Sequence, residues 1–219
     1  DESFVLEAAK ALSALIGLSP ARIDVLISAK AISGYVYLLD TRSTVASESL
    51  WALGNIAAES NTFRDILLDV GVMDAVVKFV GMEKRKNLLR DAAWVISNLC
   101  CGKTPRPDHA KVIVCLPAIK RLLTMNDEVV LEHTLWSLSN LSYRPSTDGI
   151  YTQFLERLVE LLGNSSASVL IPCLQTIRNI ACGPEEQIKH LIKLKLLPRL
   201  VALLVSSKSC VVKEAVIVL

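Results

Sequence analysis

The chain has 219 residues, of which 52% are hydrophobic, and its mean hydropathy of +0.43 is enough to bury a large continuous core. Twenty-four basic and 22 acidic residues leave a net charge of +2, which excludes nucleic-acid binding driven by bulk charge. No apolar run reaches the ~18 residues that span a membrane. Aromatic residues make up only 5%, and a composition rich in Leu, Val, Ile and Ala favours helices packed on helices.

A nine-residue pattern recurs along the chain, with Trp, then Asn four residues later, then an aliphatic residue. It reads ESLWALGNI at 48–56, DAAWVISNL at 91–99 and HTLWSLSNL at 133–141. A fourth copy is PCLQTIRNI at 172–180, a weaker one is EAAKALSAL at 7–15, and EAVI at 214–217 begins a last one. The positions equivalent to Trp are Lys10, Trp51, Trp94, Trp136, Gln175 and Ile217, with spacings of 41, 43, 42, 39 and 42 residues. A constant period near 42 indicates a structural repeat. The short fourth interval indicates either a trimmed first helix or a missing loop.

Each period divides into three predicted helices. In one repeat they cover residues 62–68, 72–80 and 85–101, separated by turns at Gly71 and Gly81. The pairs Asn61-Thr62 and Asn126-Asp127 are predicted N-caps. Two short helices and one long helix per repeat are typical of armadillo repeats, whose units stack because none can bury its own apolar face.

The predicted fold is therefore all-α, a right-handed superhelical armadillo-repeat solenoid with three helices per repeat. We expect a single domain over 1–219, with repeats near 18–59, 60–102, 103–143 and 144–182 and partial repeats at 1–17 and 183–219.

The Trp and Asn side chains are predicted to lie on the outer face of the long helices. Leu50, Leu53 and Ala57 form one apolar stripe, whereas Trp51 and Asn55 belong to a stripe whose centre is roughly 160° away at about 100° per residue. A single helical Trp is more simply explained as core. Three in the same register, each followed by Asn, favour a binding surface, because exposed indoles reduce solubility.

This face suits an extended, cationic peptide. Helices stacked ~8–10 Å apart would offer an Asn amide, both donor and acceptor, every two or three residues of a strand that advances ~3.3 Å per residue. Slots between indoles fit the aliphatic stems and cations of Lys or Arg. Glu48 and Asp91, three residues before a Trp, and Glu59, one turn after Asn55, supply negative charge.

The segments LWALGNIA at 50–57, WVISNLC at 94–100 and FRDIL at 63–67 closely resemble the importin-α (karyopherin-α) family. The resemblance implies a nuclear import adaptor that shuttles between cytoplasm and nucleus and binds classical nuclear localization signals of cargo proteins in the family's major signal-binding site. It also implies that Glu59 is the acid that grips the critical signal lysine. Importin-β would bind through an N-terminal segment outside this chain. The expected peptide-binding residues are Glu48, Trp51, Asn55, Glu59, Asp91, Trp94, Asn98, His133, Trp136, Asn140 and Asn179.

The sequence departs from the family pattern at several positions. The first copy has Lys10 and Ala14 in place of Trp and Asn, and His133 stands where an acid is expected. Gln175 and Ile217 end the run of Trp residues. These departures indicate altered ends of the groove.

Other functions fit the sequence less well. The chain has no P-loop, GxGxxG, GxSxG or HExxH motif, no CxxC spacing and no Cys/His cluster with metal-ligand spacing. We therefore expect no enzyme activity, cofactor, metal or disulfide, although a Cys/His pairing across repeats stays open. An armadillo scaffold or adaptor for a different peptide remains the alternative. The acids beside the Trp residues disfavour direct RNA or DNA binding.

Overall fold

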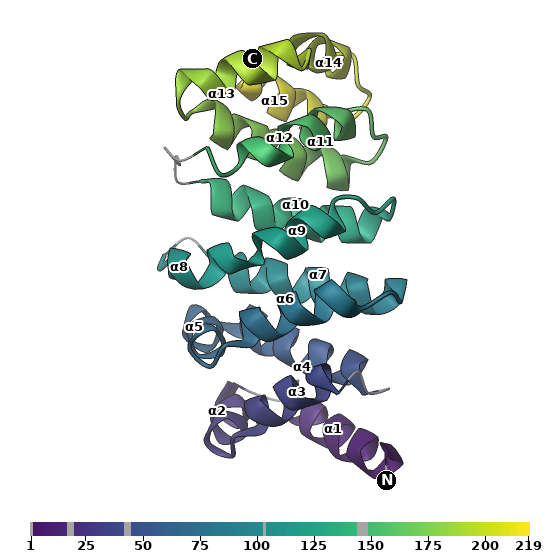
Figure 1. Ribbon diagram of the computed structural model, residues 1–219, viewed down its shortest axis with the longest axis vertical. Coiled ribbons are helices and arrows are strands. Elements are labelled where there is room, and N and C mark those ends of the chain that lie inside the picture. The colour runs from purple at the N-terminus through teal and green to yellow at the C-terminus, as the bar shows by residue number, and fades with distance from the viewer. Residues whose placement is uncertain (1, 17–19, 42–44, 103, 144–148) are drawn as a thin grey trace. The chain divides into compact units, whose positions relative to one another are not determined.

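The computed structural model describes residues 2–16, 20–41, 45–102, 104–143 and 149–219, and every regular element in these ranges is helical (Figure 1). The all-α prediction is thus confirmed. The chain divides into two compact units, 1–122 and 123–219, which we describe separately. The expectation of a single domain over 1–219 stays a prediction. Among the described helices, none combines the length and the apolarity that a membrane crossing requires.

Unit 1 contains two complete three-helix repeats, preceded by one long helix. Its long helices α1, α4 and α7 are linked by direct packing of α1 on α4 and of α4 on α7. The helices predicted at 62–68, 72–80 and 85–101 correspond to α5, α6 and α7, with ends that differ by at most two residues. The elements of unit 1 are α1 (Glu2–Ile16), α2 (Pro20–Ser28), α3 (Ala31–Asp40), α4 (Ala46–Glu59), α5 (Asn61–Asp69), α6 (Val72–Met82), α7 (Lys86–Cys100), α8 (His109–Val112), the 3-10 turn η1 (Ile113–Cys115) and α9 (Leu116–Leu122).

Unit 2 repeats the same scheme, and its long helices α10, α12 and α15 pack in that order. Of the described residues 149–154, between α10 and α11, only the 3-10 turn is helical. The elements of unit 2 are α10 (Glu128–Ser142), η2 (Thr152–Phe154), α11 (Leu155–Leu161), α12 (Ala167–Ala181), α13 (Glu185–Lys193), α14 (Leu196–Leu203) and α15 (Ser209–Val218).

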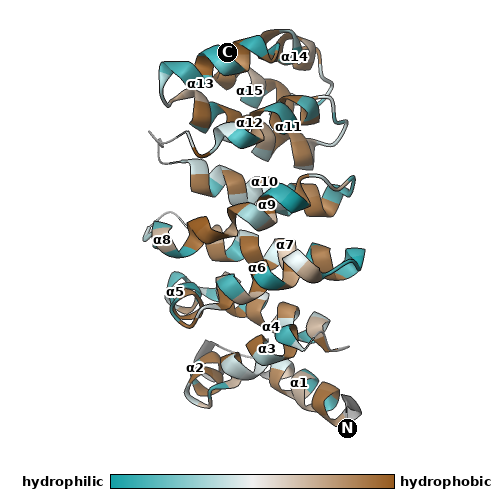
Figure 2. Cartoon of the chain, viewed as in Figure 1, coloured by the Kyte–Doolittle hydropathy of each residue, from teal (hydrophilic) through white to brown (hydrophobic). Residues whose placement is uncertain are grey.

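The long helices bury one apolar face, as α4 illustrates. Leu50, Leu53 and Ile56 on α4 are fully buried, as the helical period predicts. Figure 2 shows that hydrophobic and hydrophilic segments alternate along the helices of both units. Each fully buried Leu or Ile contributes about 1.5–3 kcal/mol, so the seam between long helices holds each unit together.

Polar side chains fix where the helices begin. The Oγ atom of Ser60 accepts a hydrogen bond from the Phe63 amide at 3.2 Å, so Ser60 caps α5 and the predicted cap at Asn61-Thr62 is wrong by one residue. Asp127 caps α10 through the Val130 amide, as predicted. Ahead of α7, the buried carboxylate of Glu83 accepts hydrogen bonds from the Arg85 side chain and two backbone amides, which lowers the pKa of Glu83 to about 2.

Candidate peptide-binding site

The tryptophans of unit 1 are not sealed in the core. Trp51 on α4 is 46% exposed, and Trp94 on α7 is partly exposed. On α1 the equivalent position holds Lys10, whose ammonium group lies 3.0 Å from Glu7 in an exposed ion pair. Trp51 is thus exposed as predicted, whereas the Trp94 ring is only partly exposed and packs on the neighbouring helix α4.

Gly54 on α4 leaves the space that the Trp94 ring occupies. A Cβ atom added at Gly54 would lie 2.1 Å from Cζ3 of Trp94, so the indole rests directly on the α4 backbone. The carboxamide nitrogen of Asn98 donates a hydrogen bond to the Gly54 carbonyl at 3.1 Å. Gly in a helix interior costs about 0.5–1 kcal/mol relative to Ala, and here it admits the side chains of the next repeat. Sequence reasoning missed Gly54, although a mid-helix glycine was a visible signal.

We call the Trp-equivalent positions of the copies, together with the residue four positions after each, the ladder. In unit 1 its carboxamides are Asn55 and Asn98. Asn55 donates its Nδ2 hydrogen bond to the Trp51 carbonyl at 2.8 Å, and Asn98 donates to Gly54. No hydrogen bond from the described residues reaches the Oδ1 atom of either Asn. Each oxygen can therefore accept from a backbone N–H of an incoming strand, while the nitrogen can exchange its partner for a strand carbonyl.

Asp91 is a half-buried acid beside the ladder. Its Oδ2 atom accepts a hydrogen bond from Ser47 Oγ at 3.1 Å, across from α4 to α7. Burial raises the pKa of the Asp91 carboxyl, against the smaller effects of Ser47 and the Arg90 charge. A ligand cation would favour the ionised form of this carboxylate. Glu48, at the equivalent position of α4, is also partly exposed.

A hollow of about 470 Å³ brings Glu59 and Asn98 together in unit 1. It lies between the end of α4, the start of α5 and the end of α7. Its size suits a long side chain, and the exposed Glu59 supplies negative charge at its wall. The lining residues are Ala57, Ala58, Glu59, Ser60, Asn61, Asn98, Cys101 and Gly102.

Arg64 fixes one wall of this hollow from inside the protein. Its side chain is 1% exposed, and Nη1 donates to the Cys101 carbonyl at 2.7 Å and to Asn61 Oδ1 at 2.9 Å. A Cβ atom on Gly102, which has φ +126°, would lie 2.1 Å from Nη1. The guanidinium also pairs with Asp65. Arg64 thus ties the segment after α7 to α5, a role that sequence reasoning missed because it identified Arg64 only as part of a family motif.

In unit 2 the ladder keeps its carboxamides, but His133 and Pro172 stand where Glu48 and Asp91 stand in unit 1, and only Glu214 on α15 is an acid in this register. Trp136 is partly exposed, Asn140 Nδ2 donates to the Trp136 carbonyl at 3.0 Å, and Asn179 Nδ2 donates to the Ser139 carbonyl at 2.9 Å. His133 occupies the position of Asp91. Burial lowers the pKa of His133, against the Glu132 charge, so the imidazole is neutral near pH 7.

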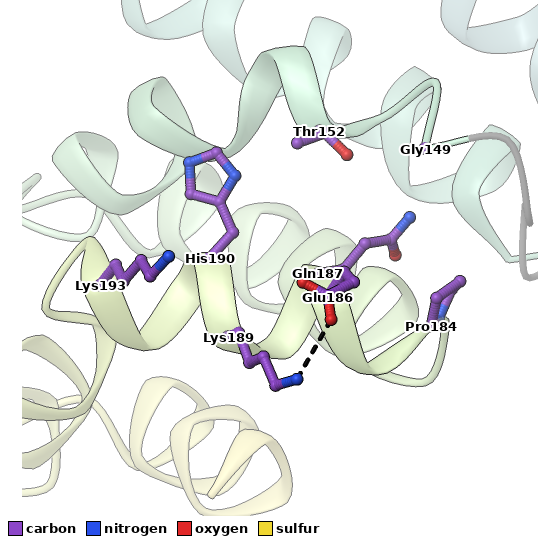
Figure 3. Close-up of a pocket in the computed structure, with 8 residues that line it drawn as sticks. All are labelled: Gly149, Thr152, Pro184, Glu186, Gln187, Lys189, His190 and Lys193. Carbon is purple, nitrogen blue, oxygen red and sulfur yellow. Dashed lines mark hydrogen bonds and ion pairs between the residues drawn. The ribbon is translucent and has the colours of Figure 1, made fainter.

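A second hollow, of about 490 Å³, lies on α13 in unit 2 (Figure 3). None of the predicted ladder residues lines it, and its polar groups include the ion pair of Lys189 with Glu186. The Nε2 atom of Gln187 points across it toward the Gly149–Thr152 side but is itself buried and has no hydrogen-bond partner among the described residues. The lining residues are Gly149, Thr152, Pro184, Glu186, Gln187, Lys189, His190 and Lys193.

Comparisons with known proteins agree with this architecture. A family model described as Armadillo/beta-catenin-like repeat matches residues 60–101. Importin subunit alpha-1b of Oryza sativa subsp. japonica is 36% identical over 95% of this chain and 40% of its own length. Importin subunit alpha-3 of Arabidopsis thaliana is 37% identical with the same coverage. The chain thus spans about two fifths of the length of these relatives.

Solved structures show the same repeat. A designed armadillo repeat protein in complex with the peptide (KR)4 is 28% identical, with a TM-score of 0.84 over 97% of this chain and 90% of that chain. A computationally designed armadillo repeat protein for modular peptide recognition is 26% identical, with a TM-score of 0.89 over 100% of this chain and 93% of that chain. Taken with the importin-α relatives, these matches show that the chain belongs to the importin-α family of armadillo-repeat proteins.

Proposed function

We propose that this chain is the signal-binding part of a nuclear import adaptor, which holds the Lys/Arg-rich localization signal of a cargo protein as an extended peptide. The observation that carries the proposal is the arrangement on α4 and α7. There the Trp94 ring and the Asn98 carboxamide lie against Gly54, and Asn98 shares a hollow with Glu59. The importin-α relatives and the designed armadillo protein in complex with (KR)4 support the same reading.

The carboxamides would fix the ligand backbone. Asn55 and Asn98 in unit 1, and Asn140 and Asn179 in unit 2, each have a backbone-bonded nitrogen and an available oxygen. A strand carbonyl and N–H can bond to such an amide together, so the groove orders an extended chain without reading its side chains.

The indoles and acids would select cations. A Lys or Arg stem beside Trp51 or Trp94 gains a cation–π contact worth about 0.5–2 kcal/mol. Glu59 provides the counter-charge for a lysine that enters the hollow beside Asn98. Glu48 and Asp91 add negative charge along the same face. Half-buried Asp91 would attract a ligand cation most strongly, because its carboxylate is partly desolvated.

The wider role follows from the family. We infer cargo proteins with a nuclear localization signal as partners, importin-β as a partner through a segment outside this chain, and shuttling between cytoplasm and nucleus. We also infer that residues 1–219 act as one armadillo-repeat domain.

Fluorescence anisotropy with a labelled Lys/Arg-rich peptide of about ten residues tests the proposal. The wild-type chain should bind it saturably, and the double variant Trp94→Ala with Asn98→Ala should lose that binding while its helical circular dichroism stays unchanged. Tyr37→Ala is the matched control, because Tyr37 is an exposed aromatic on α3, outside the ladder. Absence of wild-type binding at low ionic strength would refute the function. Unfolding of the double variant would show that the ladder is structural, and equal binding of a non-basic peptide would favour a general scaffold.

A further inference from the structure

The residue three positions after each ladder position changes abruptly in the fourth copy. The three Trp-containing copies have small residues there, Gly54, Ser97 and Ser139, whereas α12 has Arg178. Replacing a small side chain with a long, charged one at this position changes both the space and the charge of that part of the ladder.

In unit 1 the small residue makes room for the next indole. The Trp94 ring lies so close to Gly54 that even a Cβ atom would overlap it. In unit 2 a guanidinium stands at this position, and the ladder residue of the following helix, α15, is Ile217 and not Trp. Arg178 thus takes volume that an indole on α15 would need.

Arg178 also engages the acid of the following repeat. Its Nη1 atom lies 3.8 Å from Oε2 of Glu214 on α15. Gln175, at the ladder position of α12, donates a hydrogen bond to Glu214 Oε1 at 3.3 Å. Glu214 stands three residues before Ile217, in the same register as Glu48 and Asp91. Its side chain is only 16% exposed, so both the intramolecular cation and the surrounding residues screen it from a ligand.

We propose that Arg178 is a specificity-determining residue that ends the cation-binding part of the ladder. Its guanidinium occupies the place that a ligand Lys or Arg would take beside Glu214. This part of unit 2 therefore accepts uncharged or acidic ligand residues, oriented through Asn140 and Asn179, and rejects basic ones. The inference rests on the proposed function and adds a preference for a basic run that has a non-basic flank.

The test replaces Arg178 with serine, the residue found at this register in three other copies, as Ser13, Ser97 and Ser139. Three labelled peptides share one basic run and carry Lys, Ser or Glu flanks at both ends. The affinity of the Lys-flanked peptide and the net charges of the peptides give an expected affinity for the Ser- and Glu-flanked peptides. The wild-type chain should bind these two peptides roughly threefold to tenfold more tightly than that expected value. Arg178→Ser should shift the preference toward Lys flanks. Glu214→Gln, which leaves the arginine unpaired, should strengthen the rejection of Lys flanks.

Arg199→Ser is the matched control, because Arg199 is an exposed arginine on α14 and the variant loses the same charge. The inference is overturned if Arg178→Ser keeps the wild-type flank preference or if Arg199→Ser changes it equally. Should Arg178→Ser not fold, as judged by circular dichroism, Glu214→Gln decides the matter, and an unchanged preference in that variant overturns the inference. Failure of the wild-type chain to bind any of the three peptides refutes the proposed function itself.

Discussion

Single side chains set the charge of each part of the ladder. Glu48 and Asp91 precede the two tryptophans of unit 1, and His133 precedes Trp136 in unit 2. A carboxylate at this position attracts a basic ligand residue, whereas a neutral imidazole does not. Burial lowers the pKa of His133 and raises that of Asp91, so as the pH falls His133 gains a positive charge and Asp91 loses its negative charge.

The first prediction concerns His133 and pH. Below its lowered pKa, His133 gains a positive charge that repels a basic peptide, so affinity should fall as the pH falls below the ordinary 6.5 of an imidazole. His133→Gln should remove part of this fall and leave the part that comes from Asp91. His133→Glu should bind the basic peptide more tightly at pH 7. Anisotropy titrations across this range check both variants, and identical pH profiles for the wild type and His133→Gln would contradict the prediction.

The same pKa shift has a consequence for stability. The folded state holds fewer protons on His133 than the unfolded state does between the lowered pKa and the ordinary 6.5. The free energy of unfolding should therefore decrease as pH falls from 6.5 through the folded pKa. His133→Gln should lack this component in chemical denaturation measured at both ends of the range.

At the scale of helices, contact between α4 and α7 depends on the absence of a side chain at one position. Gly54→Ala would drive a methyl group into the Trp94 ring and displace the indole, the Asn98 hydrogen bond, or both. The cost should be about 1–3 kcal/mol of unfolding free energy, typical of overpacking. Gly34→Ala on α3 is the control, because a Cβ there meets nothing within 4 Å, and it should be neutral or stabilising.

A double-mutant cycle identifies the cause. In a Trp94→Ala background, Gly54→Ala should lose most of its cost, because the ring that it displaces is gone. Denaturant melts of the four proteins give the coupling, and near-UV circular dichroism reports the indole environment. A cost of Gly54→Ala that is the same in both backgrounds would show that the methyl group is not opposed by the ring.

The helices themselves were largely predictable from sequence. The three-helix period gave α5, α6 and α7 within two residues at each end, because apolar spacing and turn glycines are local signals. The exposure of Trp51 also followed from the helical period. The roles of Gly54 and Arg64 could not be predicted, because they depend on how closely two helices approach each other. Local sequence does not determine the distance between helices. The observed cap of α5 is Ser60 and not the predicted Asn61, because both residue types suit an N-cap and only the geometry of the chain selects one.

At the scale of the whole chain, the sign of the net charge does not favour the proposed ligand. The chain carries a net charge of +2, yet the proposed ligand is cationic. Long-range attraction therefore cannot draw the peptide in, and binding must come from acids close to the ladder. At physiological salt the Debye length is about 8 Å, so only acids within a few ångströms of the ligand contribute strongly.

This distribution predicts a salt dependence that belongs to particular acids. Affinity for the basic peptide should fall as salt rises, and the double variant Glu48→Gln with Glu59→Gln should bind more weakly at low salt with a flatter salt dependence. The control pair Asp74→Asn with Glu156→Gln removes two exposed acids from α6 and α11, outside the ladder, and raises the net charge equally. It should keep nearly the wild-type affinity at every salt concentration. If anisotropy titrations from low to physiological salt gave the same change for both pairs, total charge and not the acids beside the indoles would govern binding.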